Sequence, residues 1–89
     1  MNEWIVRIRV VLKPAVNDPQ GLAIRGGLHQ LGFADVSSVR AGKFFEVKLA
    51  APDRPTAEKA AQDMCRRLLA NPVIEDFSFE LEPIAALSV

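Results

Sequence analysis

The chain has 89 residues, 49% of them hydrophobic, and its 11 basic residues balance 11 acidic ones. This size and apolar content predict one domain with a two-layer core, and the zero net charge argues against nucleic acid or an anionic membrane as a partner. A single cysteine, no signal-like N-terminus and no apolar run of membrane-spanning length predict a cytoplasmic protein.

The first expected element is a strand that begins at Trp4 and ends at Leu12. Every second residue of this segment is apolar, whereas Arg7 and Arg9 fall on the other face. Pro14 follows the strand and has no backbone N–H to continue a ladder. The pattern therefore predicts a strand with one side in the core.

A helix is expected to begin near Pro19, which fits the first helical position, with Asn17 or Asp18 as the N-cap. Gly32 lies where a left-handed residue would end the helix. The apolar residues at helical spacing are expected to face the core: Ile24, Leu28 and Leu31. Leu22 projects away from this stripe, which makes it a weak candidate for contact with another chain.

Two strands are expected in the middle of the chain, over residues 36–40 and 43–49, and they form a hairpin around Gly42. In the second of these strands the apolar and polar positions alternate. The hairpin would place Phe45, Val47 and Leu49 on the core face.

A second helix is expected after Asp53, which is placed to cap it, with Pro55 in the first turn. Its apolar stripe is expected to consist of Ala57, Ala61, Met64 and Leu68, flanked by Cys65 as a small buried side chain. Asn71 and Pro72 end the helix, because asparagine accepts a left-handed conformation and proline cannot continue the hydrogen-bond ladder.

A last strand is expected over residues 77–82, where Phe77, Phe79 and Leu81 alternate with polar side chains. Residues 1–82 are then one domain, and residues 83–89 are a short apolar tail. The charged faces of the strands are expected to meet, with Arg7 and Arg9 beside carboxylates of the neighbouring strands.

The order of elements, β-α-β-β-α-β, predicts a ferredoxin-like α+β two-layer sandwich. Its antiparallel sheet would have the strand order 4-1-3-2, with both helices on one face. No catalytic, cofactor-binding or metal-binding residues are expected, because the chain has one histidine, one cysteine and no evident partner to orient His29 as a base.

The residues with the best claim to a function lie in turns, where docking surfaces are often built. The candidate partner interface consists of Asp18, Pro19, Gln20, Gly21, Leu22, Arg40, Gly42, Lys43, Asn71 and Pro72. Each also has a structural explanation as a helix cap, a turn or a helix terminator.

The same turns carry a family resemblance that spans nearly the whole chain. The matching segments are Leu12-Lys13-Pro14, Asp18-Pro19-Gln20-Gly21, Leu28-His29-Gln30-Leu31-Gly32, Val39-Arg40-Ala41-Gly42-Lys43 and the run from Cys65 to Glu75. Together they resemble the PurS subunit of phosphoribosylformylglycinamidine (FGAM) synthase, a glutamine-dependent ligase of purine biosynthesis.

The resemblance implies a non-catalytic accessory subunit that bridges a large synthetase subunit and a glutaminase subunit and assists ammonia transfer between them. It implies that ATP and Mg are bound by the large subunit and that the chain forms a homodimer or a higher homo-oligomer. Isolated, the chain should have no activity of its own.

Three other classes remain open from the residues alone. An ACT-like small-molecule regulatory module shares the fold and uses backbone groups at subunit interfaces. An RNA-recognition module has the same element order, but Phe45 should point into the core and the chain has no net positive charge. An acylphosphatase-type enzyme would need a cationic side chain between Val16 and Gly21, where there is none.

Overall fold

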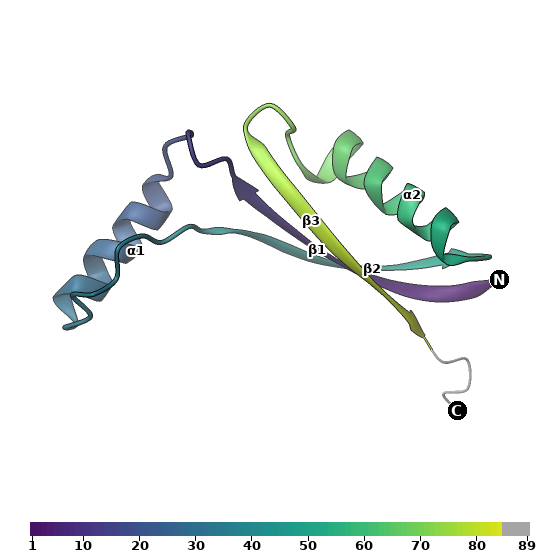
Figure 1. Ribbon diagram of the computed structural model, residues 1–89, viewed down its shortest axis with the longest axis horizontal. Coiled ribbons are helices and arrows are strands. Elements are labelled where there is room, and N and C mark those ends of the chain that lie inside the picture. Colours follow the sequence, from purple (N-terminus) through teal and green to yellow (C-terminus); the bar gives the residue numbers. More distant parts are fainter. Residues whose placement is uncertain (85–89) are drawn as a thin grey trace.

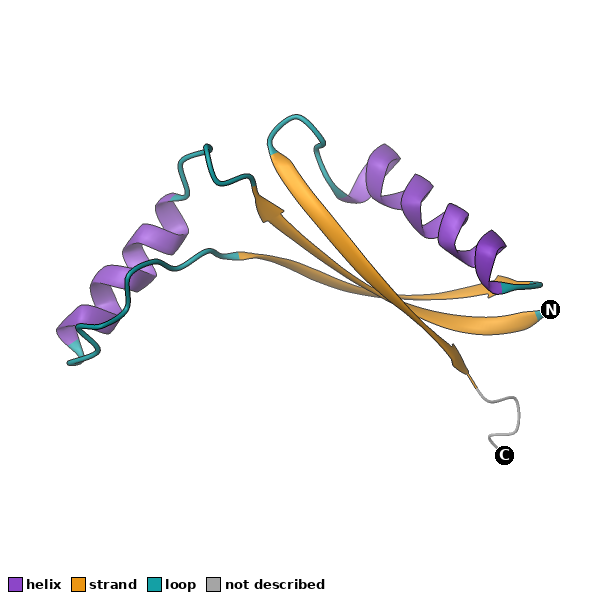
Figure 2. Ribbon diagram, in the orientation of Figure 1, coloured by secondary structure: helices purple, strands orange, loops and turns teal. Residues whose placement is uncertain are grey.

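The computed structural model describes residues 1–84, which form one antiparallel sheet, two α-helices and a π-helical turn, η1 (Figures 1 and 2). The elements are β1 (Asn2–Leu12), α1 (Pro19–Gln30), β2 (Gly42–Ala51), α2 (Arg54–Met64), η1 (Cys65–Leu69) and β3 (Glu75–Ile84). The strand β3 includes the first two residues of the expected tail, and residues 85–89 lie outside the described part. Neither described helix is long and apolar enough to cross a membrane.

The sheet has the order β2-β1-β3, with β1 antiparallel to both neighbours. Ile8 at its centre is paired with Phe45 of β2 and Phe79 of β3. The predicted order 4-1-3-2 is not confirmed as a whole, because the described residues form three strands rather than four. The three strands that are present are neighbours as in that order.

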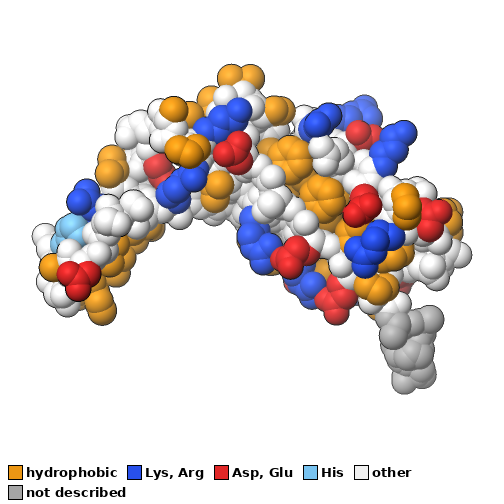
Figure 3. All heavy atoms as spheres, viewed as in Figure 1, with side chains coloured by type: hydrophobic (Ala, Val, Ile, Leu, Met, Phe, Trp, Pro, Cys, Tyr) orange, Lys and Arg blue, Asp and Glu red, His pale blue; other side chains and the backbone are white. Residues whose placement is uncertain are grey.

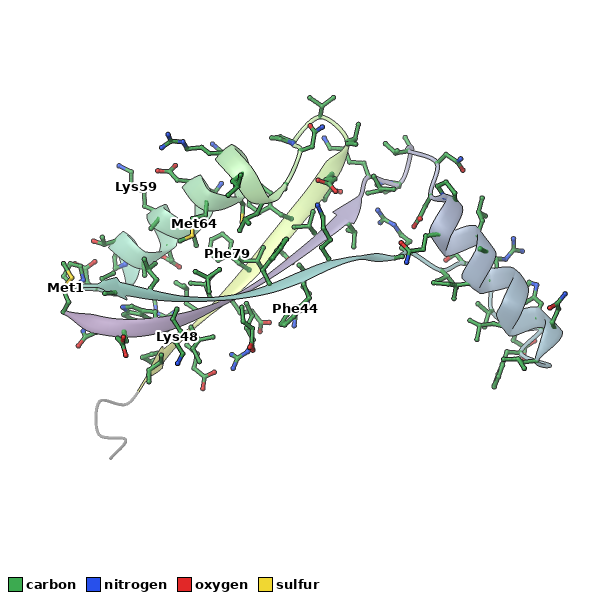
Figure 4. The ribbon with its side chains drawn as sticks, turned by 180° about the vertical axis from the view of Figure 1, so that it is seen from behind. Met1, Phe44, Lys48, Lys59, Met64 and Phe79 are labelled. Atoms are coloured by element: carbon green, nitrogen blue, oxygen red, sulfur yellow. The ribbon has the colours of Figure 1, made fainter. Side chains whose placement is uncertain are left out.

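The predicted apolar face of the sheet is the core face, and α2 covers it. Val6, Ile8 and Val10 of β1 are fully buried. Small buried side chains pack against them, namely Ala61 of α2 and Cys65 of η1, whereas the buried Ala57 of α2 packs against Trp4 and Ala51. Figure 4 shows Met64 and Phe79 between α2 and the sheet, with Phe44 and Lys48 on the other side.

The other face of the sheet carries the predicted cross-strand charge pairs. Arg7 Nη1 lies 2.6 Å from a carboxylate oxygen of Glu82, and Arg7 Nε lies 3.4 Å from Glu46. Arg9 Nη1 lies 2.7 Å from Glu80, and its guanidinium lies over the ring of Phe44 at 5.6 Å. These pairs are exposed, so they fix strand register more than they stabilise the fold.

The starts of both helices and the end of α1 follow the sequence closely. Asp18 caps α1, and Asp53 caps α2 by accepting a hydrogen bond from the backbone N–H of Thr56 at 2.9 Å. Gly32 has φ of 100°, and the N–H groups of Gly32 and Phe33 donate to carbonyls of the last turn of α1. This is the hydrogen-bond pattern of a Schellman motif, which requires the left-handed glycine.

The end of the second helix differs from the prediction. The N–H of Ala70 donates to the carbonyl of Cys65 at 2.9 Å, five residues back, so the last turn is π-helical. The wider turn rotates the side chains within it relative to a regular α-helix. Leu68 is therefore 84% exposed instead of buried, and Leu69 packs against the core in its place.

The prediction that both helices cover one face of the sheet is wrong for α1. This helix points away from the sheet and has no extensive contact with α2 or with any strand (Figure 1). Its expected core residues Ile24 and Leu31 are exposed, and Leu28 is half-buried. These residues do form an apolar stripe along α1, but no other part of the described chain packs against it.

The predicted strand over residues 36–40 is also absent, and with it the hairpin around Gly42. The backbone of this segment is used elsewhere: the N–H of Val36 donates to Phe33, and the carbonyl of Val36 lies 2.8 Å from His29 Nε2. Residues 33–41 thus return along α1 as an irregular segment. We call α1 and this segment together the α1 arm, residues 19–41.

Candidate functional site

The turn residues singled out in the sequence gather at one end of the sheet. At this end β1 finishes while β2 and β3 begin, because Val11 is paired with Gly42 and Leu12 with Glu75. The α1 arm leaves the sheet here and returns to it here (Figure 1). Three loops that are distant in the sequence therefore share one surface.

Asp18 joins the start of the α1 arm to its return. Its Oδ1 accepts a hydrogen bond from the N–H of Gly21 at 2.9 Å, and its Oδ2 accepts one from the N–H of Ala41 at 3.0 Å. The hydrogen bond from Gly21 first, then that from Ala41 and the nearby charge of Arg40, lower the pKa of Asp18 below its ordinary value. The carboxylate is thus a structural tie as well as a helix cap.

Two glycines allow the backbone segments at this end to approach closely. Gly21 is buried, and a Cβ there would overlap the carbonyl oxygen of Val39 on the returning segment. A Cβ at Gly42 would overlap the carbonyl oxygen of Val10. Both predicted turn residues are therefore required by packing within the chain, which accounts for glycine at each position.

Glu75 links the second and third loops, and it was missing from the predicted set. One of its carboxylate oxygens accepts from the N–H of Asn71 at 2.7 Å, and the other lies 3.7 Å from Lys43 Nζ. The sequence does contain a signal for it: Glu75 is in phase with Phe77, on the face of β3 that points to the core. A carboxylate at such a position needs partners nearby.

Asn71 ends the helix in a different way from the predicted left-handed turn, because its φ is negative. Its side-chain oxygen accepts from the N–H of Val73 at 3.0 Å, and its carbonyl accepts from the N–H of Glu75 at 2.7 Å. Pro72 between them is exposed. The loop before β3 is thereby held in one shape next to Lys43.

Two open pockets flank Asp18. The larger has a volume of about 510 Å³, and the segment Pro14–Asp18 lines it together with Leu22 and Arg40. The smaller, of about 210 Å³, is lined on its polar side by Gln20, Lys43 and Glu75. Leu22 and Arg40 are largely exposed, so this surface combines an apolar side chain with a cation.

The remaining polar groups that could react lie outside this end of the sheet. Cys65 is fully buried, and burial raises the pKa of its thiol. His29 is exposed on α1 next to the Val36 carbonyl. Within residues 1–84, no three His, Cys, Asp or Glu side chains are grouped as metal ligands would be.

Taken together, the arrangement is a surface rather than a cleft with reacting groups. Asp18 and Glu75 are engaged in holding loops, and the side chains left exposed between them are those of Gln20, Leu22 and Arg40. Pro19 and Pro72 are exposed beside them. Such a mixed polar and apolar surface is suited to docking another protein.

Comparison with known proteins gives a consistent result. The family model described as PurS, phosphoribosylformylglycinamidine (FGAM) synthase, matches residues 5–83. The chain is 52% identical to the PurS subunit of FGAM synthase from Synechocystis over 75 residues, which cover 84% of this chain and 75% of the relative. It is 41% identical to the PurS subunit from Bacillus subtilis, over 91% of this chain and 95% of the relative.

Solved structures show the same relationship. The structure of Thermus thermophilus PurS is similar with a TM-score of 0.83 and 37% identity, covering 93% of this chain and 99% of that one. A chain in the structure of PurLQS from Thermotoga maritima has a TM-score of 0.81 and 27% identity, covering 94% of this chain and all of that one. The chain therefore belongs to the PurS family of FGAM synthase subunits.

Proposed function

We propose that this chain is a non-catalytic, cytoplasmic subunit of FGAM synthase that bridges the large synthetase subunit and the glutaminase subunit. The observation that carries the proposal is the likeness, over nearly its whole length, to a chain of the Thermotoga maritima PurLQS structure. The complex would convert FGAR, glutamine and ATP into FGAM, glutamate, ADP and phosphate. ATP and Mg would be bound by the large subunit.

The contacts of the polar side chains support a non-catalytic role. Asp18 and Asp53 cap helices, Glu75 holds a loop, and Arg7 and Arg9 pair with carboxylates across the sheet. General base or nucleophilic catalysis needs a reactive side chain next to a group that activates it. These side chains are instead engaged with backbone groups or with carboxylates across the sheet.

Ammonia transfer gives the proposed bridge a chemical purpose. Ammonia released by the glutaminase into water would be protonated and would diffuse away, so a protected passage between the two active sites raises the yield of amination. An adaptor subunit can form part of the wall of such a passage without contributing reactive groups. The end of the sheet that carries Gln20, Leu22 and Arg40 is the surface we assign to contact with these subunits. The chain would also associate with itself.

The direct test mixes the chain with its two partners. The isolated chain should have neither glutaminase nor ATPase activity. Size-exclusion chromatography of the three proteins, with glutamine and ADP present, should give one complex that includes the chain. Turnover of glutamine or ATP by the chain alone, or elution of the chain apart from both partners under all conditions, would contradict the proposal.

A further inference from the structure

An exposed apolar patch lies on the α2 side of the chain, where η1 leads into the loop before β3. Leu68 of η1 is 84% exposed, and Val73 in the loop is 80% exposed. Pro72, next to Val73, is exposed as well. Figure 3 shows hydrophobic side chains at the tip of the loop between η1 and β3. We call Leu68, Pro72 and Val73 the η1 patch.

The π-helical turn is what brings Leu68 to the surface. In a regular α-helix this residue would continue the apolar stripe that includes Ala61 and Met64. The hydrogen bond from the N–H of Ala70 to the carbonyl of Cys65 widens the turn and leaves Leu68 outside the core. Turns of this kind are rare and are frequently found at functional sites. The exposure of Leu68 thus results from the backbone hydrogen bonding of the helix end.

The loop that carries the rest of the patch is held by hydrogen bonds. Asn71 Oδ1 accepts from the N–H of Val73 at 3.0 Å, and the carbonyl of Asn71 accepts from the N–H of Glu75 at 2.7 Å. The carbonyl of Ile74 accepts from the N–H of Lys13, directly after β1, at 2.8 Å. A surface whose backbone is already ordered pays less conformational entropy when a partner binds. The tip of the loop is therefore pre-organised for a contact.

Two cations border the η1 patch. Arg66 and Arg67 directly precede Leu68, and both are exposed. The ion pairs that form among residues 1–84 include neither of them. The patch therefore presents apolar surface next to positive charge that no carboxylate of the described chain neutralises.

We infer that the η1 patch docks on another subunit of the FGAM synthase complex, at an apolar depression bordered by carboxylates. The charge argues against a second copy of this chain as the occupant. A two-fold contact through the patch would bring Arg66 and Arg67 of one copy against the same residues of the other, and such like charges repel. A partner with carboxylates at the rim of its depression would instead compensate both guanidinium groups.

This inference rests on the proposed function. A chain that contacts two different subunits needs more than one contact surface. The η1 patch adds a surface on the α2 side to the one around Leu22 and Arg40, which lies on the side of the α1 arm.

The test measures the affinity of the full chain for each partner subunit by isothermal titration. Leu68→Ser should weaken binding to one of the two subunits by about 10-fold or more, because it truncates the apolar anchor of the contact. Arg67→Glu should weaken binding to the same subunit by about 10-fold, because it sets a carboxylate against carboxylates. Lys59→Glu makes the same change of charge about two turns earlier on α2, and it should leave both affinities unchanged.

Both variants should fold, because Leu68 and Arg67 are exposed, and thermal unfolding checks this. Unchanged affinity for both subunits in Leu68→Ser, or equal losses in Arg67→Glu and Lys59→Glu, would overturn the inference. A loss of self-association in Leu68→Ser without a loss of subunit binding would overturn it too, because a second copy would then cover the patch. Failure of the unmodified chain to bind either subunit would overturn the proposed function as well, whereas variants that bind as tightly as the unmodified chain would overturn this contact alone.

Discussion

The carboxylate of Asp18 accepts a hydrogen bond from the backbone N–H of Ala41 at 3.0 Å, across 23 positions of the sequence. Its other oxygen caps α1 through Gly21. One side chain therefore joins the start of the α1 arm to its end, where the arm meets the sheet. This carboxylate therefore helps to set the position of the arm and of the proposed docking surface beside it.

Asp18→Ala should destabilise the chain more than Asp53→Ala. The first substitution removes a local cap at Gly21 and also a hydrogen bond from the distant Ala41, whereas the second removes only a local cap at Thr56. Urea unfolding followed by the fluorescence of Trp4, the single tryptophan, measures both changes. Equal midpoints for the two variants would show that the bond to Ala41 contributes nothing.

Stability should fall in acid partly because of Asp18. Its pKa in the folded chain is lower than the ordinary value of 3.8, so as the pH falls the unfolded state takes up the proton first. The stabilisation is thus complete above about pH 5 and is lost between pH 3.8 and the lowered folded pKa. Asp18→Asn should flatten the dependence of the unfolding free energy on pH in this window. An unchanged slope would contradict the cause given for the shift.

Glycine-to-alanine substitutions should change the unfolding free energy in opposite directions at different positions. Gly21→Ala and Gly42→Ala should each cost about 1–3 kcal/mol of unfolding free energy, because the new methyl group overlaps a backbone carbonyl oxygen. Gly26→Ala meets open space within α1 and should instead stabilise the helix by about 0.5–1 kcal/mol. Urea denaturation of the three variants under one set of conditions makes the comparison. The same sign for all three would be evidence against these close approaches.

Arg40→Glu should weaken binding to the partner subunits by about 10-fold, because it reverses a charge on the proposed docking surface. Lys59→Glu is the matched control, since Lys59 lies exposed on α2, away from that surface (Figure 4). Isothermal titration with the partner subunits measures both affinities. Equal losses for the two variants would remove this end of the sheet from the interface.

The local features of the fold could be predicted because adjacent residues determine them. Asp18 and Pro19 specify a helix start, Gly32 a helix end, and the alternation from Trp4 to Leu12 a strand with one apolar side. The three strands and the charge pairs of Arg7 and Arg9 follow from the same alternation. Each of these signals is contained within a few residues.

The placement of α1 could not be predicted in this way. An apolar stripe such as Ile24, Leu28 and Leu31 shows which side of a helix is to be covered, but it does not show by what. The sequence analysis assigned that role to the sheet of the same chain, and the structure leaves the stripe uncovered. The strand predicted over residues 36–40 is absent for a related reason. Phe33 and His29 of the arm engage the N–H and the carbonyl of Val36, which a strand would have paired.

In the candidate site, too, the local features could be predicted and the long-range contacts could not. The sequence analysis placed the candidate interface residues in three turns, and in the structure these turns lie at one end of the sheet. The links between them depend on long-range contacts, namely Asp18 with Ala41 and Glu75 with Lys43. Turn patterns alone do not specify such contacts, so Glu75 was missed although it holds two of the loops together.

The most direct measurement compares FGAM formation by the two partner subunits, with and without this chain, using either glutamine or ammonium as the nitrogen source. The account predicts that addition of the chain restores the glutamine-dependent rate and changes the ammonium-dependent rate much less, because its role is assembly and delivery rather than chemistry. A glutamine-dependent rate that is equally high without the chain would contradict this account.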